Sequence, residues 1–139
     1  VDFEAECFYG SYHSVDSSDA AFQTAARIGM TEGMANCAPV LLEPIMHVKI
    51  HVPSDSTASV NGVISTRRGK ILGFDSRPGW QGWDTVEAEI PQSELHDLIV
   101  ELRSLTQGVG TYEQKFHHLA ELTGKLAENV VAEQKKSAA

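Results

Sequence analysis

The clearest pattern in the chain is an alternation of hydrophobic and polar residues from Ile45 to Val52. Successive side chains of a strand point to opposite faces, so this segment predicts a strand that is buried on one face only. Its hydrophobic side is Met46, Val48, Ile50 and Val52, and its polar side is His47, Lys49 and His51. Further strands are predicted over residues 70–76, 84–90 (with Val86, Ala88 and Ile90 facing inward) and 111–117 (with Tyr112 and Phe116 on one side).

Other segments repeat hydrophobic residues at the three-to-four residue spacing of amphipathic helices. The first is 17–35, with Asp16 or Ser17 as the expected N-cap and a hydrophobic face made largely of small residues. Two more helices are expected to begin at prolines and end at glycines, because proline is common at the N-terminus of a helix and glycine at its C-terminus. They run from Pro53-Ser54 to Gly69 and from Pro91 to Gly108, the second with a stripe of Leu95, Leu98, Ile99 and Leu102, and a short helix follows over about 124–135.

The order of elements from Ile45 onward is therefore β-α-β-β-α-β. This order predicts an α+β, ferredoxin-like domain: a four-stranded antiparallel sheet with two helices on one face. A short strand over residues 3–9 and the helix 17–35 precede it as a strand-helix remnant of another domain, and Asn36 and Pro39 break the pattern between them. We expect domains at 1–38 and 39–122, followed by a C-terminal helix and tail at 123–139.

Composition narrows the possible functions. The formal net charge of −8 argues against a general polyanion binder such as a DNA-binding protein, although it leaves room for a local RNA contact. No apolar run approaches the roughly 20 residues of a membrane-spanning helix, so we expect no membrane partner. The two cysteines, Cys7 and Cys37, are too few for a disulfide scaffold, and we expect reduced thiols. The start at Val1 suggests a piece of a longer protein.

Four motifs carry a family resemblance. GSYHSVDSSDAAF, PVLLEPIM, RRGKILG and ELRSLTQGVGTY follow one another from Gly10 to Tyr112. In this order and at these separations they resemble the C-terminal part of bacterial elongation factor G. The resemblance implies that residues 1–38 are the end of the fourth domain of that factor and residues 39–122 its fifth, ferredoxin-like domain.

Elongation factor G is a ribosomal GTPase that promotes movement of tRNA and mRNA, and its nucleotide site lies in its N-terminal domain. The present chain contains no G-x-x-x-x-G-K-[ST] loop, so we expect no enzymatic activity and no cofactor in this fragment. GTP and Mg²⁺ would be bound by the N-terminal domain of the parent. The resemblance implies a cytoplasmic protein, and we expect surfaces exposed by truncation to allow the fragment to self-associate.

The resemblance also implies ribosome contacts. The loop before the first helix corresponds to the tip of the fourth domain, which enters the decoding region beside the mRNA codon and tRNA of the A site. Its candidate RNA-contacting residues are Ser11, Tyr12, His13, Ser14 and Asp16. The basic residues Arg67, Arg68, Lys70 and Arg103 correspond to positions of the fifth domain that abut ribosomal RNA and protein near the GTPase-associated centre of the large subunit. For the cluster at 67–70, the alternative is a helix end whose positive charge merely suits the dipole.

Several positions depart from the family pattern: Val63, Thr66, His96-Asp97-Leu98, Val109 and the hairpin 76–83 that holds Trp80 and Trp83. They favour a divergent paralogue, with translocation, ribosome recycling or another specialised ribosomal role as alternatives. The tryptophans would either plug the sheet edge or form a protein-contact patch. His13, Asp16 and Ser17 do not form a hydrolase triad, because the two last residues are better used at the helix start.

A different class of function remains as an alternative, namely a stand-alone ferredoxin-like module that binds a small ligand or metal through its histidine-bearing strand face. His47 and His51 share that face, and His117-His118 lies at another strand end. A polar sheet face explains these histidines without a ligand, and a metal site needs three or four converging groups. We therefore assign no metal ligand from the sequence.

Overall fold

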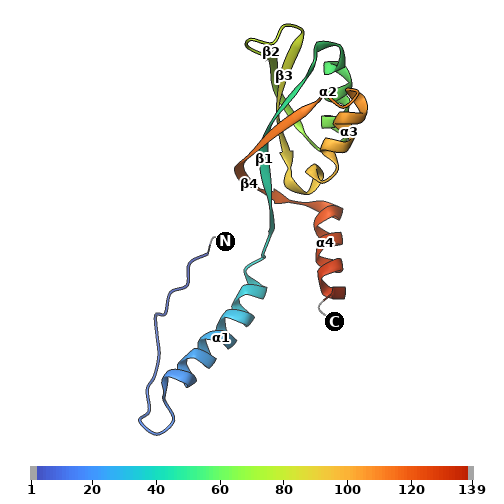
Figure 1. Ribbon diagram of the computed structural model, residues 1–139. Coiled ribbons are helices and arrows are strands. Elements are labelled where there is room, and N and C mark those ends of the chain that lie inside the picture. Colours follow the sequence, from blue (N-terminus) through green and yellow to red (C-terminus); the bar gives the residue numbers. More distant parts are fainter. Residues whose placement is uncertain (1–2, 138–139) are drawn as a thin grey trace. The chain divides into compact units, whose positions relative to one another are not determined.

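The computed structural model describes residues 3–137, and the chain divides into two compact units between Pro39 and Val40. The first unit contains one helix, and the second contains the sheet and the remaining helices (Figure 1). Within the described residues, no helix has both the length and the apolar character needed to cross a membrane.

The first unit consists of an extended segment, a turn and helix α1 (Asp19–Asn36). The predicted strand 3–9 is wrong, since residues 3–13 form neither helix nor strand. A strand needs a neighbour to accept and donate its backbone hydrogen bonds. No such neighbour occurs among the described residues of this unit, so the alternating sequence stays extended without pairing.

Among the described residues of the first unit, no layer covers helix α1. None of its residues is buried, and the larger apolar side chains are all exposed: Phe22, Ile28, Met30 and Met34. The helix begins at Asp19 rather than at residue 17, and its N-cap is Ser18 instead of Asp16 or Ser17, because the Ser18 hydroxyl accepts the backbone N–H of Ala21 at 3.2 Å. Local capping, rather than packing, thus defines where this helix starts.

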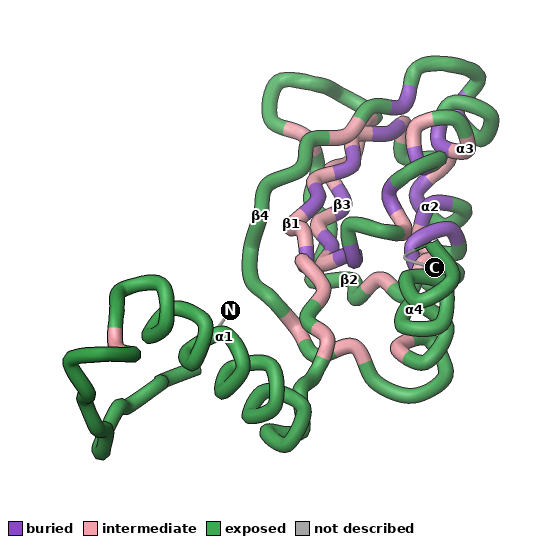
Figure 2. The backbone as a smooth tube through the Cα atoms, turned by 90° about the horizontal axis from the view of Figure 1, so that it is seen from below, coloured by how far each residue is buried: buried purple, intermediate pink, exposed green. Residues whose placement is uncertain are grey.

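The second unit has the predicted βαββαβ order and the predicted fold class. Its elements are β1 (Leu41–Pro53), α2 (Thr57–Thr66), β2 (Lys70–Ser76), β3 (Trp83–Pro91), α3 (Leu98–Leu105), β4 (Thr111–Leu122) and α4 (Gly124–Ser137). Short 3₁₀ turns, η1 (Ser54–Ser56) and η2 (Gln92–Leu95), precede α2 and α3. The strands form an antiparallel sheet in the order β2-β3-β1-β4, and α2 and α3 lie on the same side of it (Figures 1 and 2).

Element ends differ from the sequence expectations in two ways. Strands β1 and β4 extend beyond the predicted 45–52 and 111–117, because they pair with each other from Leu41 opposite Leu122 to His51 opposite Thr111. The two covering helices start later than their prolines, after a 3₁₀ turn. At the first of these turns the hydroxyls of Ser54 and Thr57 donate to the carboxylate of Asp84 on β3, at 2.9 and 2.8 Å.

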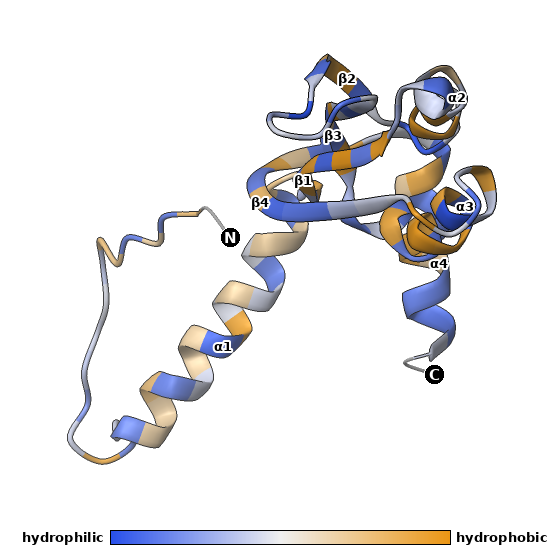
Figure 3. Cartoon of the chain, turned by 45° about the horizontal axis from the view of Figure 1, so that its top comes forward, coloured by the Kyte–Doolittle hydropathy of each residue, from blue (hydrophilic) through white to orange (hydrophobic). Residues whose placement is uncertain are grey.

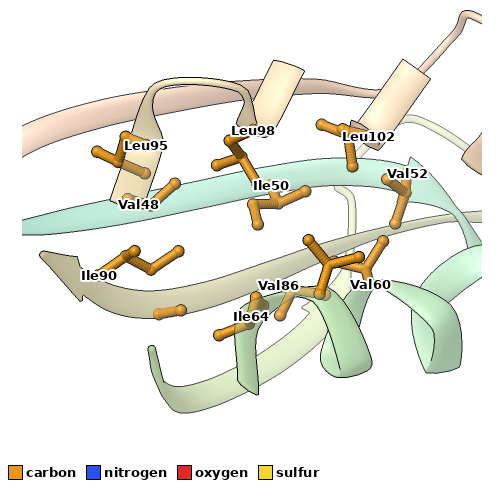
Figure 4. Close-up of a cluster of buried hydrophobic side chains, with 12 residues drawn as sticks. Val48, Ile50, Val52, Val60, Ile64, Val86, Ile90, Leu95, Leu98 and Leu102 are labelled. Carbon is orange, nitrogen blue, oxygen red and sulfur yellow. The ribbon is translucent and has the colours of Figure 1, made fainter. Parts of the chain in front are cut away.

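The core lies between the sheet and the two covering helices. In the register of β1 and β3, Val48 is opposite Ala88 and Ile50 is opposite Val86, and all four are fully buried. Figure 4 shows Val48, Ile50 and Val86 within this core. The alternation of hydrophobic and hydrophilic residues along β1 and β3 is visible in Figure 3. The helices contribute Val60, Val63, Ile64, Leu98 and Leu102, and η2 contributes Leu95. On β4, Tyr112 packs against this core, whereas Phe116 stays exposed.

Two backbone features fix the ends of these elements. Helix α2 ends with Arg68 in the left-handed conformation (φ 55°) and a hydrogen bond of 2.9 Å from the N–H of Gly69 to the carbonyl of Ile64. A Cβ on Gly69 would lie 2.5 Å from Cγ2 of Ile64, so only glycine fits there. In the hairpin after β2, Gly79 and Gly82 both have φ 78°, which is the signature of two successive type II turns.

Replacing Ile50 by alanine should destabilise the second unit by about 2–5 kcal/mol, because it leaves a cavity in the centre of the core. Urea unfolding followed by tryptophan fluorescence measures this unit specifically, since Trp80 and Trp83 both belong to it. The matched control is Val100→Ala, at a position that is 67% exposed, which should change the free energy of unfolding by less than about 0.5 kcal/mol. Equal effects of the two substitutions would contradict the assignment of the core.

Candidate functional sites

The loop before α1 is closed by two hydrogen bonds between the same residues. The backbone N–H of Ser17 donates to the carbonyl of His13 at 2.9 Å, and the Ser17 hydroxyl accepts the N–H of His13 at 2.9 Å. Because Ser18 then caps the helix, these two serines hold a turn at residues 14–16. The turn therefore forms a short loop of fixed geometry directly before the helix.

All five residues that the sequence predicts for RNA contact lie on this loop with exposed side chains: Ser11, Tyr12, His13, Ser14 and Asp16. The ring of Tyr12 stacks on that of Phe22 from α1, with ring centroids 6.5 Å apart and planes 14° from parallel. One aromatic face is therefore held in place by the helix, and 69% of the Tyr12 surface is still exposed. Such a surface offers stacking and hydrogen-bonding groups without a pocket.

The predicted basic residues of the second unit fall into two pairs. Arg67 and Arg68, at the end of α2, are both held by carboxylates. Arg67 donates to Glu101 on α3, with Nη2 to Oε2 at 2.7 Å, and its Nη1 donates to the carbonyl of Glu94. Its side chain is only 15% exposed.

Arg68 forms a two-pronged pair with Glu43 on β1, at 2.8 and 3.0 Å, and its Nε donates to Glu94 at 3.1 Å. The hydrogen bonds to Glu43 raise the pKa of Arg68 above its ordinary value. We interpret these contacts as a clamp that joins the end of α2 to β1, η2 and α3, hereafter the arginine clamp (Arg67, Arg68, Glu43, Glu94 and Glu101). Bidentate pairs of this kind fix geometry as well as charge.

Lys70 and Arg103 differ from the clamp residues. Both side chains are exposed, and neither forms a salt bridge within residues 3–137. Lys70 is the first residue of β2, and Arg103 lies in the last turn of α3, where a positive charge also suits the helix dipole. Of the four predicted residues, these two have charges that remain available to a partner.

The sheet face opposite the helices is polar, as its sequence predicts. Lys49 and His47 on β1 both approach Glu87 on β3, at 2.9 and 3.3 Å. The hydrogen bond between Lys49 and Glu87 raises the pKa of Lys49 and lowers that of Glu87. His51 is hydrogen-bonded to the Thr85 hydroxyl at 2.9 Å, and partial burial, with the nearby charge of Arg77, lowers its pKa.

The tryptophan hairpin packs mainly on itself. Trp80 and Trp83 meet edge to face with centroids 5.2 Å apart, and the guanidinium carbon of Arg77 lies 4.2 Å from the Trp80 ring centroid. Trp80 remains 49% exposed. Elsewhere, Cys7 and Cys37 are exposed, and neither forms a disulfide within the described residues.

Sequence reasoning missed one group of side chains. Glu89, His117 and His118 each place a ligand-type atom within 4.8 Å of the other two. The adjacent histidines could be seen in the sequence, but strand alternation predicts opposite directions for neighbouring residues. The irregularity that brings them together is a β-bulge, which has no reliable sequence signature when no glycine marks it.

Comparisons with known proteins agree with this architecture. The family model described as "Elongation factor G, domain IV" matches residues 1–38, and the model described as "Elongation factor G C-terminus" matches residues 40–130. The chain therefore belongs to the elongation factor G family. The second match extends to residue 130, within α4.

Two relatives are much longer than this chain. It is 48% identical over 130 residues to an "Elongation factor G-like protein" of Synechocystis sp., an alignment that covers 94% of this chain and 19% of that protein. A crystal structure of a protein from Thermus thermophilus is similar with a TM-score of 0.81 and 40% identity, covering 93% of this chain and 19% of the other. The chain thus spans about a fifth of the length of these relatives.

Replacing Arg67 by methionine, which keeps the aliphatic stem, should destabilise the second unit by about 1–2 kcal/mol, because a partly buried carbonyl and Glu101 lose their partner. Urea unfolding measures the change. Arg103→Met is the control with the same change of residue type at an exposed position, and it should be nearly neutral. If both variants are neutral, the arginine clamp does not contribute to stability.

Proposed function

We propose that this chain is the ribosome-contacting arm of an elongation-factor-G-type translational GTPase. The observation that supports this most strongly is that two consecutive domains of that family match the chain in order, with an exposed tip loop at the start of α1. The contribution of the chain is positional: it touches and supports the ribosome while chemistry occurs elsewhere. GTP and Mg²⁺ would be bound by another domain of the parent protein, in the cytoplasm.

The tip loop is the proposed contact with the decoding region. Tyr12 offers an aromatic face, and His13, Ser11 and Ser14 offer exposed polar groups. Aromatic stacking and contacts to ribose and phosphate do not depend on base identity. An element that meets every codon and tRNA in turn needs this tolerance.

The second unit is the proposed contact with the large subunit near the GTPase-associated centre. The structure favours Lys70 and Arg103 as the residues that neutralise phosphates, because their charges are not already paired within the described chain. Arg67 and Arg68 would act chiefly by holding this surface in place through the arginine clamp, because carboxylates already pair with their charges.

Two reactions are compatible with such a ribosome-contacting arm. Translocation of tRNA and mRNA is the function that the family suggests, and ribosome recycling or another specialised step is the alternative. The departures at Val63, Thr66 and Val109 favour a paralogue, and the Synechocystis relative is itself described as elongation factor G-like. A direct comparison of single-round translocation and ribosome splitting with the full-length protein separates these two roles.

Substituting His13 by alanine in the full-length protein should slow whichever of these two reactions the unmodified protein supports, by roughly tenfold, a size typical of losing one contact to an unpaired base. His96→Ala is the control, since that histidine is also highly exposed but lies in the second unit. The free energy of unfolding should be unaffected, because the His13 side chain is exposed. An unchanged rate in both reactions would remove the tip assignment.

Reversing the charge of Lys70 or Arg103 to glutamate should weaken ribosome binding. Each variant should make the negative slope of log affinity against log salt concentration shallower by about 1, the value expected for one lost phosphate contact. Lys125→Glu in α4 is the charge-matched control. A slope equal to that of the control would exclude these residues as phosphate contacts. The same reversal at Arg67 or Arg68 would be less informative, since it would place a carboxylate against Glu94 and its neighbours.

A further inference from the structure

Two adjacent histidines on β4 converge with a carboxylate of β3. The Nδ1 atoms of His117 and His118 are 2.6 Å apart, and Nδ1 of His117 is 3.7 Å from Oε1 of Glu89. The imidazole rings meet edge to face with centroids 4.9 Å apart. Consecutive residues of a regular strand would point to opposite faces, so this convergence needs a structural cause.

The cause is the bulge where β4 pairs with β1. His118 lies opposite Ile45 and Phe116 lies opposite Met46, so His117 is an extra residue without a partner on β1. An extra residue of this kind interrupts the alternation and re-aims the side chains beside it. Bulges commonly adjoin functional sites for this reason.

Glu89 completes the group from the other side of β1. The sheet order places β1 between β3 and β4, and Glu89 is paired with His47 of β1, which in turn is opposite Lys115 of β4. The Glu89 side chain is 20% exposed and that of His117 is 53% exposed. The carboxylate is therefore partly withdrawn from water, while the imidazoles remain accessible to an entering ion.

We propose that Glu89, His117 and His118 form a site for a divalent transition metal ion, with Zn²⁺ as the best fit. Two imidazole nitrogens and one carboxylate oxygen are a donor set typical of zinc sites that keep a fourth position for water. Each histidine would bind through the Nδ1 lone pair and carry its proton on Nε2. Mg²⁺ and Ca²⁺ are poor fits, because these ions prefer oxygen ligands.

A hydrogen bond between the two histidines is the simpler explanation of their short contact, and it makes a different prediction. In that case one Nδ1 atom donates its proton to the other, and Glu89 at 3.7 Å takes no part. A metal site instead uses both nitrogens and the carboxylate together. His47, whose ring centroid is 6.3 Å from that of His117, is close enough to border the ion without being one of the three ligands.

Isothermal titration of the 139-residue chain with ZnCl₂ near neutral pH should show one saturable site, and MgCl₂ under the same conditions should show none. His117→Ala, His118→Ala and Glu89→Gln should each weaken zinc binding at least about tenfold, since even groups outside the ligand shell are worth about 10–100-fold in metal affinity. His96→Ala is the matched control, because that side chain is 90% exposed and lies between η2 and α3, outside the cluster. It should bind zinc like the unmodified chain.

A measurement on the unmodified chain tests the site without relying on the variants to fold correctly. Zinc should shift the imidazole ¹⁵N resonances of His117 and His118, with the largest change at Nδ1, and leave those of His96 in place. The site is excluded if the unmodified chain shows no saturable zinc binding. It is equally excluded if the Glu89 and His117 variants, with unchanged urea midpoints, bind as well as the control.

Discussion

Burial of one face of the sheet under α2 and α3 is the interaction on which the second unit depends. Strand β1 lies between β3 and β4, so Val48 and Ile50 occupy the centre of the core. Burial of a large aliphatic side chain contributes roughly 1.5–3 kcal/mol relative to exposure, and about a dozen such residues meet here. The arrangement leaves the opposite face of the sheet free for charged groups and histidines.

The contrast between the covered apolar face and the open polar face of the sheet also determines where the charged groups of this unit lie. The helix ends must be joined to the sheet without entering the core, and the arginine clamp does this through Glu43, Glu94 and Glu101. Of the four predicted basic residues, Lys70 and Arg103 form no salt bridge within the described chain, and these two are the ones that we propose for phosphate contact. In the first unit no comparable layer of described residues covers α1, and the tip loop is instead held by the serines at positions 17 and 18.

The sequence predicted the parts of the structure that follow from periodicity. The two faces of β1, the inward positions of β3 and the order of elements were correct, because each depends on a local pattern. The strand at 3–9 was wrong, since a strand is stable only beside another. The partners of Arg67 and Arg68 were not predictable, because they lie 25 to 34 positions away in the chain. The histidine cluster was missed because a single unpaired residue, His117, reverses the direction that alternation predicts.

The position of β1 in the sheet has a consequence for how the unit is made. Although it is the first strand of this unit along the chain, both of its neighbours follow it, and its pairing with β4 extends to Leu122. Contacts so distant in sequence slow folding, because a long loop must close before they form. During synthesis one edge of β1 therefore stays without its hydrogen-bonding partner until β4 has left the exit tunnel. The sheet is completed only after its last strand has been made.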